Sequence, residues 1–125
     1  MKVSEIMNKP VLIDENETLK KAAKTMSDKQ IGSLIVTKSN QIIGIVTESD
    51  ILRNIDKLGE KVSKIASKNL VTIEDNKTIE NAAEILSGKK IKRLPVIKSG
   101  KVIGIVTATD ILAHSDELGE DFFFE

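Results

Sequence analysis

A threonine, a second hydroxyl residue and an aspartate occur with the same spacing at two places in the chain. The first set is Thr47, Ser49 and Asp50, and the second is Thr107, Thr109 and Asp110. Hydroxyl groups can donate hydrogen bonds to phosphate oxygens, and an ionised Asp can accept from two neighbouring ribose hydroxyls. Each set lies where a strand pattern ends and a helix pattern begins, so outward-facing backbone N–H groups would favour an anion there. The spacing indicates a site for a ribose phosphate.

The same residues also have a purely structural explanation. Thr-x-x-Asp has the spacing of a capping box, in which Thr47 or Thr107 caps a helix and the acid three residues later completes its first turn. Capping explains either copy alone as well as ligand binding does. It explains less well why the longer string Gly-Ile-Val-Thr-x-x-Asp-Ile-Leu stands in both copies. Both interpretations stay open at this point.

The two sets belong to a tandem duplication. Aligning residues 18–60 with residues 78–120 without a gap gives 22 identities in 43 positions. Only two copies exist and the period is long, so each copy is expected to form half of one globular unit rather than one turn of a solenoid. The predicted organisation is repeat 1 over 1–60, repeat 2 over 61–120 and a tail over 121–125, together one compact module.

Each copy has the pattern of a short amphipathic turn followed by β-α-β-β-α, which predicts an α+β fold. The elements expected in copy one are an extended run at 10–13, a helix after Thr18, a hairpin of 33–37 and 41–47, and a helix from 48 to about 58. Those expected in copy two are 69–73, a helix after Thr78, a hairpin of 93–97 and 101–107, and a helix from 108 to about 118. The polar loop after the extended run is expected to hold one more residue in copy two, and a Gly to cap each last helix. The apolar face of each copy is expected to pack on its twin as an intramolecular pseudo-two-fold pair.

Composition excludes several classes of function. The 19 basic and 19 acidic residues cancel, which disfavours nucleic-acid binding. With no Cys and one His, neither a thiolate or multi-histidine metal site nor a Cys/His or Ser/His/Asp catalytic set is expected, so we expect no enzyme. No apolar stretch reaches the length of a membrane span and no signal peptide is present, which predicts a cytoplasmic location away from membranes. Aromatic residues are 2% of the chain, so the core must be aliphatic.

Two longer strings resemble a known family. Residues 3–11 are similar to the opening of a cystathionine β-synthase (CBS) domain, and residues 93–112, beginning Arg-Leu-Pro-Val-Ile, are similar to its signature. The resemblance covers residues 1 to about 118 and is to a stand-alone pair of CBS domains, called a Bateman module. It implies a regulatory unit that binds AMP, ADP, ATP or S-adenosylmethionine in clefts between the paired repeats. It implies no catalytic step and no required cofactor.

The resemblance also implies a role for each matching residue. Asp50 and Asp110 would hold ribose hydroxyls, with Thr47, Ser49, Thr107 and Thr109 toward phosphate. Adenine would lie against the first strand of each repeat, at Val11, Ile13, Leu70 and Thr72. Arg93 would reach phosphate, although a solvated charge at the start of a strand explains it equally well. Since Ser33, Ile35 and Glu48 stand where copy two has Arg93, Pro95 and Ala108, the second copy is expected to have the better phosphate-binding elements.

Assembly is predicted from the same resemblance and from the tail. CBS pairs commonly form disc-like dimers, so a homodimer is expected, with a regulated protein as a possible partner. The three adjacent residues 122–124 are all Phe and would form an exposed patch, which favours their docking on this chain or on a dimer mate. The alternative function is a structural or oligomerisation module that binds no nucleotide.

Overall fold

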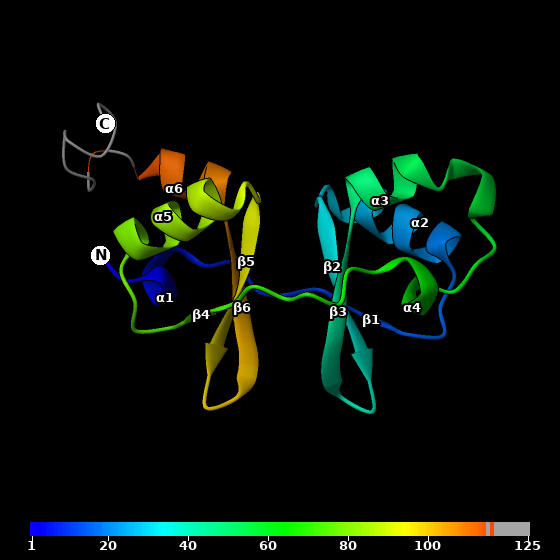
Figure 1. The fold of residues 1–125 in the computed structure, drawn as a ribbon, viewed down its shortest axis with the longest axis horizontal. Coiled ribbons are helices and arrows are strands. Elements are labelled where there is room, and N and C mark those ends of the chain that lie inside the picture. Colours follow the sequence, from blue (N-terminus) through cyan, green and yellow to red (C-terminus); the bar gives the residue numbers. More distant parts are fainter. Residues whose placement is uncertain (115, 117–125) are drawn as a thin grey trace. The chain divides into compact units, whose positions relative to one another are not determined.

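Two three-stranded sheets, each with helices on one face, make up the chain (Figure 1). The computed structural model describes residues 1–114 and 116. Residues 11–70 form one compact unit, named here the Asp50 unit, and residues 1–10 with the chain from Val71 onward form another, the Asp110 unit. The elements of the Asp50 unit are β1 (Leu12–Asp14), α2 (Leu19–Lys29), β2 (Ser33–Lys38), β3 (Gln41–Thr47), α3 (Glu48–Arg53), η1 (Ile55–Lys57) and α4 (Val62–Ile65). Those of the Asp110 unit are α1 (Val3–Ile6), β4 (Ile73–Glu74), α5 (Ile79–Lys89), β5 (Arg93–Lys98), β6 (Lys101–Thr107) and α6 (Ala108–Ala113).

The predicted β-α-β-β-α order and the α+β class are confirmed in both units. The strand orders are β1-β2-β3 and β4-β5-β6, with the first pair parallel and the second antiparallel. Both hairpins turn through two residues with positive φ, Ser39 and Asn40 in one and Ser99 and Gly100 in the other. Such turns match the right-handed twist of paired strands, which fixes their register. Thr18 and Thr78 cap the long helices, each hydroxyl accepting from a backbone N–H three residues later at 3.1 Å.

The core of each unit is aliphatic, as the composition predicts. In the Asp50 unit, Leu19, Leu34 and Val46 are fully buried between α2 and the sheet. Their counterparts Ile79, Leu94 and Val106 are fully buried in the Asp110 unit. Burial of each such side chain stabilises the fold by about 1.5–3 kcal/mol. The sheets and long helices are therefore fixed by the same apolar positions in both copies.

The compact units do not coincide with the sequence repeats 1–60 and 61–120. We call residues 1–10 and 61–70 the two lead-in segments. The first packs with copy two: Val3 and Ile6 lie in the core with Ile79, and Val3 N donates to Lys77 O at 2.9 Å. The second packs with copy one, where Val62 N donates to Glu17 O at 2.8 Å. Each unit is thus completed by the lead-in segment of the other repeat, and packing as one compact module stays a prediction.

Two glycines allow the lead-in segments to lie against the sheets. Ser67 and Ile45 exchange backbone hydrogen bonds at 2.9 and 3.0 Å beside Gly44, and Asn8 and Ile105 do so at 2.8 and 2.9 Å beside Gly104. A Cβ on Gly44 would lie 2.7 Å from the Ser67 carbonyl oxygen. A Cβ on Gly104 would instead meet the Met7 side chain. The recurring Gly of the motif therefore has a packing role in both units.

The last helix of copy one is shorter than expected. α3 ends at Arg53 rather than near Leu58, and the 3-10 turn η1 follows. Asn54 stops the helix because its side-chain Nδ2 donates to the Asp50 carbonyl oxygen at 2.7 Å while its own φ is −121°. Gly59 therefore does not cap an α-helix. α6 ends in the same way at Ala113, and residues 118 and 119 lie outside the described part of the chain.

The additional residue of copy two lies before the first strand, not after it. Ile13 pairs with Val36 and Ile73 with Val96, so both copies keep one constant offset from the strand to the last helix. Burial explains why Ile73, and not Thr72, takes the place of Ile13. Ile13 and Ile73 point into the core and are 7% and 4% exposed, whereas Thr72 is half-buried and polar. Val71 and Ile73 are therefore the counterparts of Val11 and Ile13, and the expected equivalence of Leu70 and Thr72 to those residues is wrong.

Two further expectations concern membranes and the tail. In residues 1–114 and 116, no helix is long and apolar enough to span a bilayer. The cytoplasmic location stays a prediction. Residues 121–125, with the three Phe at 122–124, lie outside the described residues, so the docking of this tail also stays a prediction.

Candidate functional site

The motif residues lie at one edge of each sheet. β3 ends at Thr47 and α3 begins at the next residue, and β6 and α6 meet in the same way at Thr107. Across the hairpins, Ser33 pairs with Thr47 and Arg93 pairs with Thr107. Because the first strand runs parallel to the second, its beginning lies at this edge too. The sequence-predicted residues of each copy are thus brought to a single edge.

In the Asp110 unit, one carboxylate oxygen receives all the hydrogen bonds. Asp110 Oδ2 accepts from Thr107 N at 2.8 Å, from Thr107 Oγ1 at 2.9 Å and from Asn8 Nδ2 at 2.9 Å. The Asp110 N–H in turn donates to Thr107 Oγ1 at 3.1 Å. Among the described residues, no group donates to Oδ1, and the side chain is half-buried. This carboxylate is held in one orientation with an oxygen still able to accept hydrogen bonds.

In the Asp50 unit, both carboxylate oxygens have donors. Asp50 Oδ2 accepts from Thr47 N at 2.8 Å and from Thr47 Oγ1 at 3.1 Å. Oδ1 accepts from Arg53 Nη2 at 2.6 Å. Asp50 is also the more buried of the two acids, with 9% of the residue exposed. The guanidinium takes the position that corresponds to the free side of Asp110.

The capping interpretation is correct for both copies. Each Thr hydroxyl accepts from the backbone N–H three residues later, and each Asp accepts from the Thr backbone N–H. One Asp50 or Asp110 oxygen is enough for this role, because a carboxylate has about four acceptor positions. Capping and ligand binding are therefore compatible in the Asp110 unit, where the second oxygen has no donor among the described residues.

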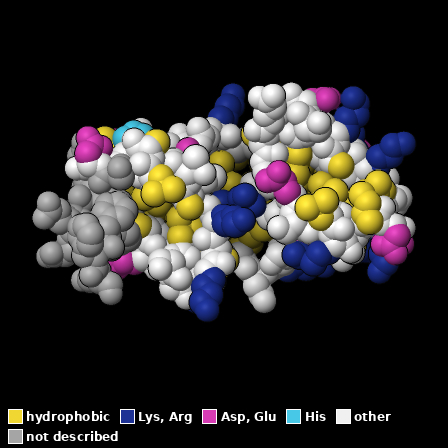
Figure 2. Space-filling view, turned by 90° about the horizontal axis from the view of Figure 1, so that it is seen from above, with side chains coloured by type: hydrophobic (Ala, Val, Ile, Leu, Met, Phe, Trp, Pro, Cys, Tyr) yellow, Lys and Arg dark blue, Asp and Glu magenta, His cyan; other side chains and the backbone are white. Residues whose placement is uncertain are grey.

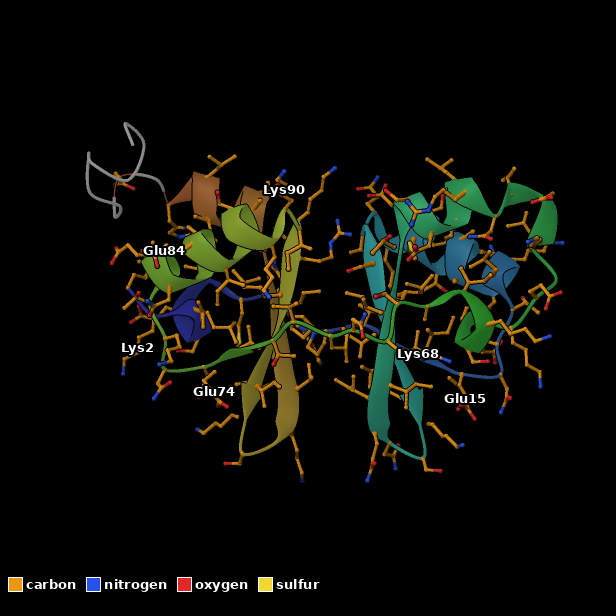
Figure 3. The ribbon with its side chains drawn as sticks, viewed as in Figure 1. Lys2, Glu15, Lys68, Glu74, Glu84 and Lys90 are labelled. Carbon is orange, nitrogen blue, oxygen red and sulfur yellow. The ribbon has the colours of Figure 1, made fainter. Side chains whose placement is uncertain are left out.

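The residues expected to lie toward phosphate differ in charge between the two edges. Ser49 and Thr109 are both exposed on the first turns of α3 and α6. In the Asp110 unit, the half-buried Arg93 lies opposite Thr107, and the Lys92 carbonyl accepts from Ala108 N at 2.8 Å. Lys90 lies just before them, where α5 leads into β5 (Figure 3). The corresponding residues of the Asp50 unit are Gln30, Gly32 and Ser33, with the exposed acid Glu48 beside them.

The residues expected to contact adenine differ in burial and in whether their backbone groups are already hydrogen-bonded. Ile13 is a core residue, which leaves only its backbone for a ligand. Val11, Leu70 and Thr72 are half-buried. The Val11 carbonyl oxygen accepts from Ile35 N at 2.9 Å. Its counterpart Val71 lies beside Pro95, which has no N–H, and no backbone N–H of the described residues donates to the Val71 carbonyl.

Two residues of these edges, Asn8 and Arg53, are absent from the sequence-based site. Asn8 is separated from Asp110 by 102 residues, and no local pattern could connect them. Arg53 follows Asp50 at i+3 on a helix, a spacing that does predict contact. Val71 lies within the strand expected to contact adenine, and the lack of a donor to its carbonyl among the described residues follows from Pro95 once the strand register is known. Asn8 and Arg53 add to the differences at 33 and 93 and at 35 and 95 that the sequence already predicts.

Two hollows of the described residues lie away from the motif acids. A groove of about 550 Å³ in the Asp50 unit lies between α2 and α3, lined by Met26, Ile31, Ile51 and Leu52 with Glu48 at its rim. A smaller depression of about 350 Å³ in the Asp110 unit includes Thr72, Asn81 and Glu84. Apolar side chains also gather on the helical surface of each unit (Figure 2). They include the exposed Leu52, Ile55 and Leu112, at 72%, 61% and 63%.

Comparison with known proteins identifies the family. The model of the CBS domain matches residues 3–57 and 62–117. The chain belongs to the CBS domain family. The resemblance read from the sequence is thereby confirmed, together with the α+β fold. Within residues 1–114 and 116, no group of three or more His, Asp or Glu side chains is placed to hold a metal ion.

Sequence relatives of this CBS chain are longer proteins. An uncharacterised protein of Methanocaldococcus jannaschii is 40% identical over 124 residues, which are 94% of this chain and 64% of that protein. A homoserine O-acetyltransferase of Methanohalobium evestigatum is 38% identical over 112 residues, which are 87% of this chain and 23% of the enzyme. The chain therefore spans less than two thirds of the length of each.

Solved CBS structures match almost end to end. A CBS-domain protein of Agrobacterium tumefaciens has a TM-score of 0.87 at 25% identity, with 92% of this chain and 99% of that chain covered. The CBS domain pair of protein MJ0100, in complex with 5′-methylthioadenosine and S-adenosyl-L-methionine, has a TM-score of 0.85 at 25% identity, with 94% and 97% covered. CBSX2 in complex with AMP shows the same fold, with a TM-score of 0.83 at 23% identity and 93% and 96% covered.

Proposed function

We propose that this CBS chain is a regulatory module that binds an adenosine compound, AMP, ADP, ATP or S-adenosylmethionine, at the sheet edge of the Asp110 unit, and that it catalyses no reaction on it. The observation that carries the proposal is the Asp110 carboxylate. Its Oδ2 is fixed by three donors, while Oδ1 has none among the described residues. A ribose diol supplies two hydroxyl donors, and an oriented carboxylate is a suitable acceptor for both.

The rest of the edge supports an adenosine ligand. The Val71 carbonyl is available to accept from an amino group such as that of adenine, because Pro95 cannot donate to it. Thr109 and Arg93 would face an anionic group beyond the ribose. The family adds chemical support, since the two compounds named with the MJ0100 pair both contain adenosine.

Thermal unfolding with added ligands tests this function. AMP, ADP, ATP and S-adenosylmethionine are each compared with inosine 5′-monophosphate, which has an oxygen in place of the adenine amino group. A ligand at about 100 times its dissociation constant stabilises the native state by about 2.7 kcal/mol, a shift of several degrees for a chain of this size. We expect such a shift with at least one adenosine compound and a smaller one with the inosine control. Unchanged unfolding with all four adenosine compounds would contradict the proposal.

The second candidate is a structural or oligomerisation module. It is favoured by Asp50, whose hydrogen bonds are all accounted for by capping and Arg53. We propose that the chain forms a homodimer through its helical surfaces, because Leu52 and Leu112 are exposed at equivalent positions in the two units. Light scattering of the protein and of Leu52→Glu tests the dimer, and a monomeric unmodified protein would contradict it. If the protein is a dimer and none of the added ligands raises its unfolding temperature, the structural module is favoured. A regulated protein partner belongs to the first candidate, the regulatory module.

A further inference from the structure

The Asp50 carboxylate is held on both oxygens by its own unit. Arg53 Nη2 donates to Oδ1 at 2.6 Å, and Thr47 donates to Oδ2 through both its backbone N–H and its hydroxyl. The Asp50 side chain is 13% exposed and the Arg53 side chain 68% exposed. The guanidinium occupies one of the two acceptor positions of Oδ1, so an incoming diol would have to share this oxygen with Arg53 or displace it.

The Asp110 unit has the same backbone at this place but no such cation. Its helix begins with φ −117° and ψ 163° at Thr107, against −121° and 167° at Thr47. The counterpart of Arg53 is Ala113, an exposed residue without a polar side chain. The additional donor here, Asn8, bonds Oδ2, the oxygen already used for capping. Oδ1 is therefore left without a donor among the described residues because Ala113 stands where the other unit has Arg53.

We propose that Arg53 is a specificity-determining residue that competes with a ribose diol for the Asp50 carboxylate, so that the chain binds its ligand first at Asp110. This inference rests on the proposed adenosine-binding function and adds which of the two edges is used. Arg53 would weaken binding at the Asp50 edge without blocking it permanently, because its exposed side chain can rotate into water.

The chemistry of the contact supports competition. A charge-assisted bond from a guanidinium to a carboxylate is shorter and stronger than one from a neutral hydroxyl. Since the Arg53 head is largely in water, its advantage is modest, and we expect about five- to tenfold weaker diol binding in its presence. Removing Arg53 leaves the Thr47 capping bonds intact, so the variant keeps the acceptor geometry that the experiment needs.

The first experiment isolates the Asp50 edge by calorimetric titration. Asp110→Ala is titrated with AMP and, separately, with S-adenosylmethionine, and so is the double variant Asp110→Ala, Arg53→Ala. We expect the double variant to bind at least one of these probes about five- to tenfold more tightly than the single variant. Lys57→Ala in the same Asp110→Ala chain is the control, because it removes an exposed positive charge nearby that makes no bond to Asp50. Equal affinities of Asp110→Ala and the double variant would overturn the proposal.

The second experiment transfers the arginine to the other unit. Ala113→Arg should weaken AMP binding about five- to tenfold, whereas Ala113→Gln should leave it close to unchanged. The 2′,3′-dideoxy analogue of AMP lacks the diol, so its affinity should not depend on residue 113. Weakening of both compounds alike would assign the effect to general charge or shape and overturn the proposal.

The unmodified protein separates this inference from the proposed function. Tight binding of one equivalent of ligand per chain, together with the expected affinity changes in the Arg53 and Ala113 variants, supports both the adenosine function and the role of Arg53. Binding of two equivalents with equal affinity keeps the adenosine function and overturns the role of Arg53. If neither the unmodified protein nor Arg53→Ala binds AMP or S-adenosylmethionine, both are overturned. Circular dichroism of each variant confirms that the fold is retained.

Discussion

The Asp50 and Asp110 units have nearly the same turn but different surroundings for it. In both, a Thr caps a helix and an Asp three residues later closes the cap. Around Asp50, Arg53 occupies the second oxygen, and the Val11 carbonyl is paired with Ile35. Around Asp110, Ala113 leaves that oxygen accessible, and Pro95 leaves the Val71 carbonyl without a strand partner.

The motif alone therefore does not determine the site. The identical Thr and Asp perform the structural task in both units, which explains why they are present twice. What a ligand would meet depends on residues outside the motif, at 53 and 113, 35 and 95, and 33 and 93. These positions all change in the direction that favours binding at Asp110. A duplicated sequence has thus produced one edge with available polar groups and one whose polar groups are paired.

The largest predicted effect concerns the two glycines that lie under the lead-in segments. Gly44→Ala would place Cβ 2.7 Å from the Ser67 carbonyl oxygen, which is fixed by its bonds to Ile45, so we expect a loss of about 2–3 kcal/mol in unfolding free energy. Gly104→Ala should cost about half as much, because the flexible Met7 side chain can move. Urea denaturation measures both. Gly88→Ala, in α5 with nothing within 4 Å of the new Cβ, is the control and should be neutral or stabilising.

The second prediction compares the two acids directly. Asp110→Ala should weaken an adenosine ligand by about thirtyfold, as expected for the loss of hydrogen bonds to a charged group. Asp50→Ala should change affinity at the Asp110 edge very little. Both variants lose the same capping bonds and should each lose about 1 kcal/mol of stability. Titration calorimetry and urea denaturation measure the two quantities, and an equal loss of affinity in both variants would remove the distinction between the units.

The third prediction concerns phosphate. Arg93→Ser gives the Asp110 unit the residue of the Asp50 unit, and we expect about fivefold weaker AMP binding at low salt, with a smaller effect at high salt. Adenosine carries no anionic group, so its affinity should not fall. Ser33→Arg is the matched exchange in the other unit. If the affinities for both ligands fall equally, Arg93 acts through the fold rather than through contact with the phosphate.

The smallest predicted effect is that of Asn8. Asn8→Ala removes one of three donors to Asp110 Oδ2, and we expect a loss of about 0.5–1 kcal/mol in unfolding free energy with a slightly weaker ligand. Ser67→Ala at the equivalent bridge removes a hydroxyl that makes no hydrogen bond to Asp50 among the described residues, so the stability of the protein should not change. Denaturation curves of both variants measure the difference. A larger loss for Ser67→Ala would contradict the assignment.

The elements and the turn could be predicted from sequence because they depend on neighbouring residues. Thr18, Thr47 and their counterparts act within one helical turn, and the hairpins depend on alternation and two-residue turns. Asn54 could also have been recognised, since an Asn side chain competes with the helix backbone. The position of the additional residue depended on which side chain, Thr72 or Ile73, enters the core.

The exchange of lead-in segments could not be predicted in this way. Val3 and Ile6 present the same apolar pair as Val62 and Ile65, so each segment fits the core of either unit. Hydrogen bonds between residues far apart in sequence, such as Val3 N to Lys77 O, determine which unit a lead-in segment packs against. Asn8 reaches Asp110 only as a result of that choice. Asn8 is therefore missed because long-range topology creates its contact, whereas Arg53 is a local neighbour that its i+3 spacing to Asp50 could have revealed.

That exchange also sets an order in which the units can form during synthesis. All partners in the Asp50 unit lie within residues 11–70, so its contacts are available as soon as that stretch has been made. The Asp110 unit must bring Asn8 to a residue 102 positions later, closing a loop that contains the whole other unit. Its higher contact order favours slower folding. The unit proposed to bind ligand is thus the last to form. Residues 1–10 stay without their partners in this unit until the later part of the chain has been synthesised.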